Sequence, residues 1–131
     1  MLGRINQMMN NFERAIFHYR ESLQIQLSYL SSTDRSLSFI YASIGANLEK
    51  LGDHNEGIKF FQNIINNCNR TKKIDQFLLT ISHLAIGRIY YKEKNLMKAR
   101  KNFQLTLEYA QNANIDDKLL REIDYYLKLV S

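Results

Sequence analysis

The chain of 131 residues has no proline, one cysteine and only five glycines. Sheet proteins with many tight turns use more proline and glycine, so the shortage of both favours a helical fold. The single cysteine, Cys68, cannot form an internal disulfide, which suits a reducing compartment. No apolar run approaches the length of a membrane span, and the start of the chain lacks the apolar core of a signal peptide. We therefore expect a cytoplasmic protein with no membrane partner.

The remaining composition is that of one ordinary domain, with 45% hydrophobic and 24% charged residues. The net charge is +5, and the sequence pI is about 9.4. Such a charge permits nucleic acid, an anionic membrane surface or an acidic protein as partner. Lys, Asn and Ile are all abundant, which AT-rich coding also produces. We favour that origin for the positive charge, so charge alone does not name the partner.

Three ladders of residues repeat along the chain, and all three advance by the same step. A fixed period of about 42 residues is the sequence signature of stacked helical repeats. The first ladder is glycine, the second small and the third aromatic: Gly3, Gly45 and Gly87; Ala15, Gly57 and Ala99; Tyr19, Phe61 and Phe103.

Apolar residues recur at helical spacing on both sides of three breaks, at 9–11, 51–53 and 93–95. Each break ends in a residue suited to capping the next helix, namely Asn11, Asp53 and Asn95. The pattern predicts a first helix to about Met8. Further helices are expected at about 11–30, 33–51, 53–70, 74–93 and 96–113. A last helix, 116–130, has no partner after it and is expected to cap the apolar end of the stack.

These residues resemble the tetratricopeptide repeat (TPR). Its pattern is a large residue, Leu-Gly and Tyr on one helix, then Ala and an aromatic on the next. The matches in order are Tyr41, Ile44-Gly45, Leu48, Gly57 and Phe61; His83, Ile86-Gly87, Tyr90, Ala99 and Phe103; and in part Leu2-Gly3, Asn6, Ala15 and Tyr19. The resemblance implies an all-α fold, an α-solenoid of stacked antiparallel helix hairpins wound into a right-handed superhelix.

Two features depart from the usual repeat. The period is longer than the usual one of about 34 residues, by about two helical turns. The proline that normally closes the second helix is absent. Longer second helices are similar to those of kinesin-light-chain-like repeats and of the Rap and PlcR type of bacterial peptide-pheromone receptors.

The resemblance also implies how the chain is organised. We expect a single TPR-like domain over 1–131, with repeats at about 1–31, 32–73 and 74–115 and a capping helix at 116–131. By the repeat period the first helix lacks about ten residues. A clipped first helix is typical of a fragment or the C-terminal part of a longer array.

The resemblance further implies a binding groove, because the first helices of TPR proteins line a concave surface. In that groove Arg4, Lys50, Arg88 and Lys92 would receive carboxylates of an acidic peptide, and Tyr91 would offer a flat contact. Arg88 is the best single candidate, since arginine can hold a carboxylate with two parallel bonds. The alternative is that these are ordinary solvated basic residues. The full set of groove candidates is Arg4, Gln7, Ala46, Glu49, Lys50, Leu84, Arg88, Tyr91 and Lys92.

No pattern for catalysis, a metal or a cofactor is present. His18, His54 and His83 have no cysteine or histidine at ligand spacing, and no phosphate-binding or nucleophile motif occurs. Basic clusters near Lys72 and Lys98 lack a nucleic-acid recognition motif, so nucleic acid is not the expected partner. We expect a non-catalytic scaffold for a protein or peptide segment. The alternatives are the peptide-sensing part of a bacterial quorum-sensing-type transcription regulator, or a module that forms a homodimer through residues 116–130.

Overall fold

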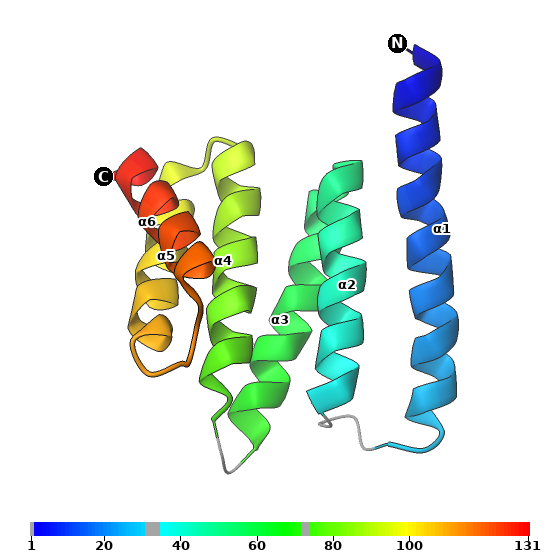
Figure 1. Cartoon of the computed structure of the whole chain (residues 1–131), viewed down its shortest axis with the longest axis horizontal. Helices are drawn as coiled ribbons and strands as arrows, with labels where there is room; N and C mark the ends of the chain where they lie inside the picture. The colour runs from blue at the N-terminus through cyan, green and yellow to red at the C-terminus, as the bar shows by residue number, and fades with distance from the viewer. Residues whose placement is uncertain (1, 31–34, 72–73) are drawn as a thin grey trace. The chain divides into compact units, whose positions relative to one another are not determined.

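A computed structural model describes residues 2–30, 35–71 and 74–131, with side chains from residue 8 onward. These residues form six α-helices and no strand, which confirms the all-α prediction. The helices are α1 (Leu2–Leu27), α2 (Arg35–Leu51), α3 (His54–Arg70), α4 (Gln76–Lys92), α5 (Leu96–Ala110) and α6 (Asp117–Val130) (Figure 1).

The chain divides into two compact units, and the division lies within α3. The first unit is Met1–Asn63 and the second is Ile64–Ser131. Each unit has a hydrophobic core of its own. The two are therefore described separately.

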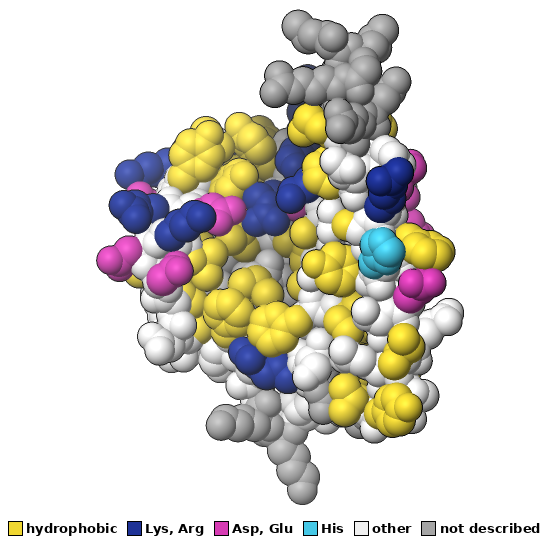
Figure 2. Space-filling model, turned by 45° about the vertical axis from the view of Figure 1, so that its right-hand side comes forward, with side chains coloured by type: hydrophobic (Ala, Val, Ile, Leu, Met, Phe, Trp, Pro, Cys, Tyr) yellow, Lys and Arg dark blue, Asp and Glu magenta, His cyan; other side chains and the backbone are white. Residues whose placement is uncertain are grey.

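The first unit is built around the packing of α1 on α2. Its core is formed by Ile16 of α1 with Leu37, Ile40, Ile44 and Leu48 of α2. The α2 residues are spaced by three or four, so they lie on one side of the helix. Helix α1 also has apolar side chains in contact with water: the side chain of Phe17 is 59% exposed and that of Ile25 is 62% exposed. Figure 2, which brings this helix forward, shows apolar side chains at its surface among charged ones.

The turn between α2 and α3 has the geometry of a helix stop with one left-handed residue. Gly52 has φ 85°, its N–H donates to the carbonyl of Glu49, and the Asp53 N–H donates to the carbonyl of Leu48. This hydrogen-bond pair is the Schellman motif. The turn allows Phe61 to lie on Gly45, where an added Cβ would be 2.8 Å from the ring. The predicted break at 51–53 is confirmed here.

The hairpin of α4 and α5 in the second unit repeats this arrangement one period later. Lys94 has φ 63°, its N–H donates to Tyr91, and the Asn95 N–H donates to Tyr90. Asn95 also caps α5 as predicted, because its side-chain oxygen accepts a hydrogen bond of 3.3 Å from the backbone N–H of Lys98. Phe103 lies on Gly87, where an added Cβ would be 2.5 Å from the ring. Phe103 is fully buried, and burying such a ring stabilises the fold by about 1.5–3 kcal/mol.

Helix α6 packs against α5 and completes the second core. Asp116 starts it by accepting a hydrogen bond of 2.8 Å from the Leu119 N–H, as expected for a helix-start residue. The ring of Tyr126 stacks on Phe103 with centroids 5.1 Å apart. At the other end, the Nε of Arg100 donates to the carbonyl of Val130 at 2.8 Å. Both ends of α6 are thus held by specific hydrogen bonds.

The prediction of a break within the first repeat is wrong. The expected break at 9–11 is absent, and Asn11, expected to be an N-cap, lies inside the continuous helix α1. The repeat position of Gly52 and Lys94 falls on Asn10, which stays helical. Apolar residues recur at helical spacing on both sides of Asn10, so the local pattern does not distinguish a break from a continuous helix. The remaining helices lie within a few residues of their predicted ranges. Two of the predicted connections between helices include residues 31–34 and 72–73, which lie outside the described residues.

Candidate partner-binding site

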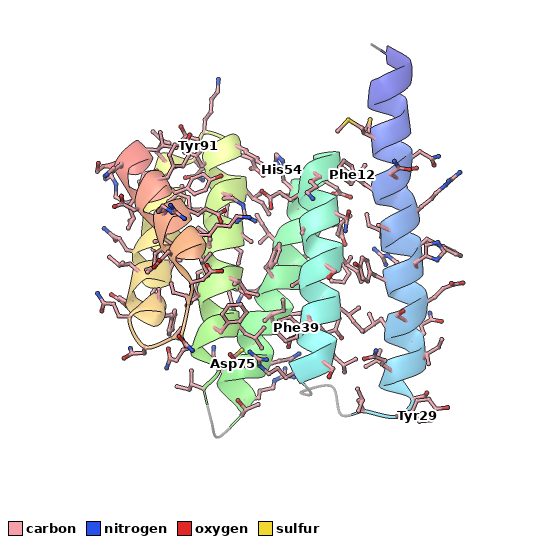
Figure 3. All side chains as sticks on the ribbon, viewed as in Figure 1. Phe12, Tyr29, Phe39, His54, Asp75 and Tyr91 are labelled. Atoms are coloured by element: carbon pink, nitrogen blue, oxygen red, sulfur yellow. The ribbon has the colours of Figure 1, made fainter. Side chains whose placement is uncertain are left out.

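The groove candidates of the first unit differ widely in exposure. Glu49 is only 6% exposed, so its side chain does not line an open surface. Lys50 is exposed, and its ammonium lies 5.4 Å from the centre of the Phe12 ring, which Figure 3 labels. Ala46 is half-buried. The side chains of Arg4 and Gln7 lie outside the described residues. Among the first-unit candidates whose side chains are described, Lys50 is therefore the one with an exposed charge.

In the second unit, α6 covers part of the predicted groove. Leu84 is 2% exposed and belongs to the core with Phe103, so its prediction as a groove residue is corrected. The Nη1 of Arg88 lies 3.2 Å from Oε1 of Glu122, and the two side chains are 21% and 39% exposed. Tyr91 meets Tyr126 edge to face, with centroids 6.3 Å apart. The guanidinium proposed to receive a partner's carboxylate already holds one from α6.

Lys92 is exposed, as a residue of an open groove must be, and it also has interactions within the fold. Glu122 was not considered in the sequence. The signal for it was available, because α6 was expected to cap the stack, and Glu122 follows Leu119 by three residues and precedes Tyr126 by four, on the same side of the helix. A capping helix must bring its own charges against the last hairpin, and an opposite charge there is favourable.

An open pocket lies beside the Arg88–Glu122 pair, nearer the start of α4. Its volume is about 430 Å³. Phe77 and Ile81 of α4 face Ile115 and Leu119 across it, and all four are half-buried. The pocket is thus apolar within and polar at its edge, where Asn114, Asp116, Lys118 and Glu122 lie. This arrangement can take up an apolar side chain and bond to the polar groups beside it.

The pocket continues the predicted groove along the same side of α4. Phe77, Ile81, Leu84, Arg88 and Tyr91 follow one another at steps of three or four residues, the spacing of one helix face. The candidates began at Leu84, so the sequence reasoning missed the two apolar residues one and two turns earlier. Asp75 and Tyr91, labelled in Figure 3, mark the two ends of this helix. Where α6 contacts Arg88 and Tyr91 the face is covered, and near Phe77 it stays open.

A second pocket of about 430 Å³ lies at the turn between α4 and α5. Tyr91, Lys92, Lys94 and Leu96 line it. It combines an aromatic ring and an apolar side chain with two lysines, and it lies at the opposite end of α4 from Phe77. These two pockets are therefore separate sites.

His83 has a structural environment. Asn102 uses its Nδ2 to donate to the Lys98 carbonyl at 2.9 Å, so its Oδ1 accepts from the His83 Nδ1–H at 3.1 Å. The imidazole stacks on Tyr109, with centroids 5.5 Å apart. Burial lowers the pKa of His83 below the ordinary value of 6.5, and the hydrogen bond to Asn102 acts in the opposite direction. His83 stands at the large-residue position of the repeat pattern, and these contacts give it a packing role.

Among the described residues, no three His, Cys, Asp or Glu side chains lie close enough together to hold a metal ion. In the same part of the chain, every helix is too short or too polar to cross a bilayer. Comparison with known protein families, curated proteins and solved structures gives no match to this chain. The geometry of its own residues is therefore the basis for a functional proposal.

Proposed function

We propose that this chain is a non-catalytic scaffold that binds a protein or peptide segment, built from TPR-like repeats of extended period. The contact of Phe61 with Gly45 and that of Phe103 with Gly87 support the repeat, because the same packing recurs at the same positions. The matching turns at Gly52 and Lys94 support it further. A stack of such hairpins in a right-handed solenoid, in the cytoplasm, is part of this proposal.

The pocket beside α4 and α6 is the single observation that carries the binding function. Its four apolar side chains, Phe77, Ile81, Ile115 and Leu119, remain half-exposed beside a well-packed core. An apolar side chain of a partner segment would bury this surface, at about 25 cal/mol per Å². Asn114 and Lys118 at the edge would bond to the partner's backbone or to an acidic side chain. Arg88 would act indirectly, by holding Glu122 in place.

The test begins with selection of binders from a random peptide display library. A selected peptide carrying a fluorophore is then titrated with the chain and its affinity measured by fluorescence anisotropy. Ile81→Asp places a charge in the apolar pocket and should weaken binding at least ten-fold, the effect of losing about 1.4 kcal/mol. Leu107→Asp is the matched control, because Leu107 is an exposed leucine of α5 outside the pocket lining.

The two variants give clear alternatives. Equal affinity of Ile81→Asp and the unaltered chain would remove the pocket from the proposal. Failure of any peptide to enrich would contradict the peptide-binding function itself. Circular dichroism of each variant verifies that the helices are retained.

A further inference from the structure

The tip of the α4–α5 hairpin exposes two adjacent large apolar residues. Leu96 is 49% and Met97 is 82% exposed, and they are the first two residues of α5. Isolated exposed apolar residues are ordinary on protein surfaces, so their surroundings must decide whether these two have a function. Their place beside the turn between two helices puts them at the end of the hairpin (Figure 1).

Positive charge surrounds this apolar tip. Between residues 92 and 101 the only acidic residue is Glu93, and the basic residues are Lys92, Lys94, Lys98, Arg100 and Lys101. All four lysines are exposed. Lys101 follows Met97 by four residues on α5, so the two share one side of the helix. Arg100 is set apart from this group because its Nε is bonded to the Val130 carbonyl.

The pocket at the turn has the same mixed character. Tyr91 and Leu96 supply apolar surface, and Lys92 and Lys94 supply ammonium groups. A tyrosine with an apolar ring and a polar hydroxyl suits the boundary between hydrocarbon and water. The tip therefore combines protruding apolar side chains, an interfacial aromatic ring and cations within a few residues of one another.

The backbone at Lys94 gives an independent reason to assign a role to its side chain. Lys94 has φ 63° at the repeat position where the preceding turn has Gly52 with φ 85°. Glycine adopts this conformation without a steric penalty, and a side chain makes it less favourable. Strained positions of this kind are concentrated at functional sites. The lysine is thus present where the turn itself would be better served by glycine.

We propose that this tip, formed by Tyr91, Lys92, Lys94, Leu96, Met97, Lys98 and Lys101, binds the surface of an anionic phospholipid bilayer. Met97 and Leu96 enter the headgroup region, and the lysines contact lipid phosphates. A bilayer fits better than nucleic acid or an acidic peptide, because neither requires a protruding methionine at the end of a hairpin. The proposal departs from the expectation of no membrane partner and is independent of the peptide pocket at the other end of α4.

The test uses co-sedimentation of the chain with vesicles of phosphatidylcholine alone or mixed with phosphatidylserine. The chain should bind only the mixed vesicles, and added salt should weaken that binding. Met97→Ser removes apolar surface without changing charge and should weaken binding on the order of ten-fold. Lys94→Glu should weaken it by a similar factor, about ten-fold, because two units of charge change near the lipid surface.

Matched controls lie on α6. Leu120→Ser and Arg121→Glu make comparable changes, loss of an apolar side chain and reversal of a positive charge, at exposed positions outside the tip, and these variants should bind vesicles as the unaltered chain does. If they weaken binding as much as the tip variants, the proposal is overturned. It is also overturned if Lys94→Glu weakens binding while Met97→Ser has no effect, since general attraction to anions would explain that result. Binding of RNA by the same variants identifies such an attraction.

Discussion

Tyr19 and Phe103 occupy the same place in their repeats, yet their surroundings are opposite. Phe103 is fully buried between Gly87 and the ring of Tyr126, whereas Tyr19 is 38% exposed on α1. The difference begins at the turn. Lys94 reverses the chain before α5, while Asn10 continues a single helix. A ring becomes a core residue only where the preceding helix folds back to cover it.

The contrast separates two features that usually occur together in a repeat: the residues at a contact between helices, and the turn that brings the helices together. The aromatic and small residues mark where two helices would touch, and the turn decides whether they do. α1 retains the residue pattern of a second helix, but it packs on α2, where Ile16 belongs to the shared core. Variants of the two regions can therefore test the turn and the contact separately.

Truncation of the two aromatic rings should give the largest difference. Phe103→Ala removes a buried ring and is expected to lower the free energy of unfolding by about 3–5 kcal/mol. Tyr19→Ala should lower it by about 1 kcal/mol or less, because the ring is partly in water. Urea denaturation followed by circular dichroism measures both. Similar losses would mean that Tyr19 is buried by a contact like that of Phe103.

Proline in α1 should distinguish a continuous helix from a hairpin. Glu13→Pro lies in the interior of α1 and is expected to cost about 3 kcal/mol. Asn55→Pro, at the corresponding repeat position, lies in the first turn of α3 and should cost less than about 1 kcal/mol, since proline is tolerated there. Both residues are exposed, so packing differs little. Equal tolerance would indicate that a second helix starts near residue 12, as the repeat pattern predicted.

Substitution of two glycines of the ladder should change stability in opposite directions in the two regions. A methyl group at Gly87 meets the Phe103 ring, so Gly87→Ala is expected to destabilise the second unit by about 1–3 kcal/mol. Gly3→Ala should instead stabilise α1 by about 0.5 kcal/mol, because alanine is the better helix former. The thermal midpoints of the two variants provide the measurement. A marked destabilisation by Gly3→Ala would reveal a close contact at that position.

Exchanging the turn residues should have a smaller effect. Lys94→Gly removes the steric strain of a side chain on a left-handed backbone and is expected to stabilise the α4–α5 hairpin by about 0.5–1 kcal/mol. Gly52→Ala introduces the opposite change and should destabilise by about 1 kcal/mol. No atom lies within 4 Å of a Cβ built on Gly52, so its conformation alone determines the result. Opposite signs in urea denaturation are the expected outcome; a shared sign would contradict the strain assigned to Lys94.

The pH dependence of the second unit should give the smallest effect. Burial lowers the folded-state pKa of His83, so between that pKa and the ordinary value of 6.5 the folded chain binds fewer protons than the unfolded chain. The stability contributed by neutral His83 is fully present above that pH and is lost as the pH falls through the folded pKa. His83→Gln should flatten this part of the urea-midpoint profile. The exposed His18 of α1 is the control: if His18→Gln flattened the profile equally, His83 would not be its source.

Local patterns predicted most of the secondary structure. The helices after residue 33, the turns at Gly52 and Lys94 and the cap at Asn95 follow from neighbouring residues, and the structure confirms them. The first repeat could not be predicted this way. A turn at Asn10 depends on the packing that a reversed helix would gain, and periodicity carries no information on that energy.

The candidate site was predictable only in part. The spacing of α4 placed Arg88 and Tyr91 on one face of the helix, but it could not show that Glu122 and Tyr126 of α6 contact them. Packing between distant segments decides which residues of a helix face remain open. Phe77 and Ile81 were therefore missed, although they lie on the same face.

The two Schellman turns share their hydrogen bonds while one holds glycine and the other lysine. The backbone bonds thus maintain the reversal without requiring one particular side chain. A mutation at this position can change the charge at the end of a hairpin while the helices on either side keep their register. In evolution or in protein design, such a turn is a place where new surface chemistry can be acquired without rebuilding the scaffold.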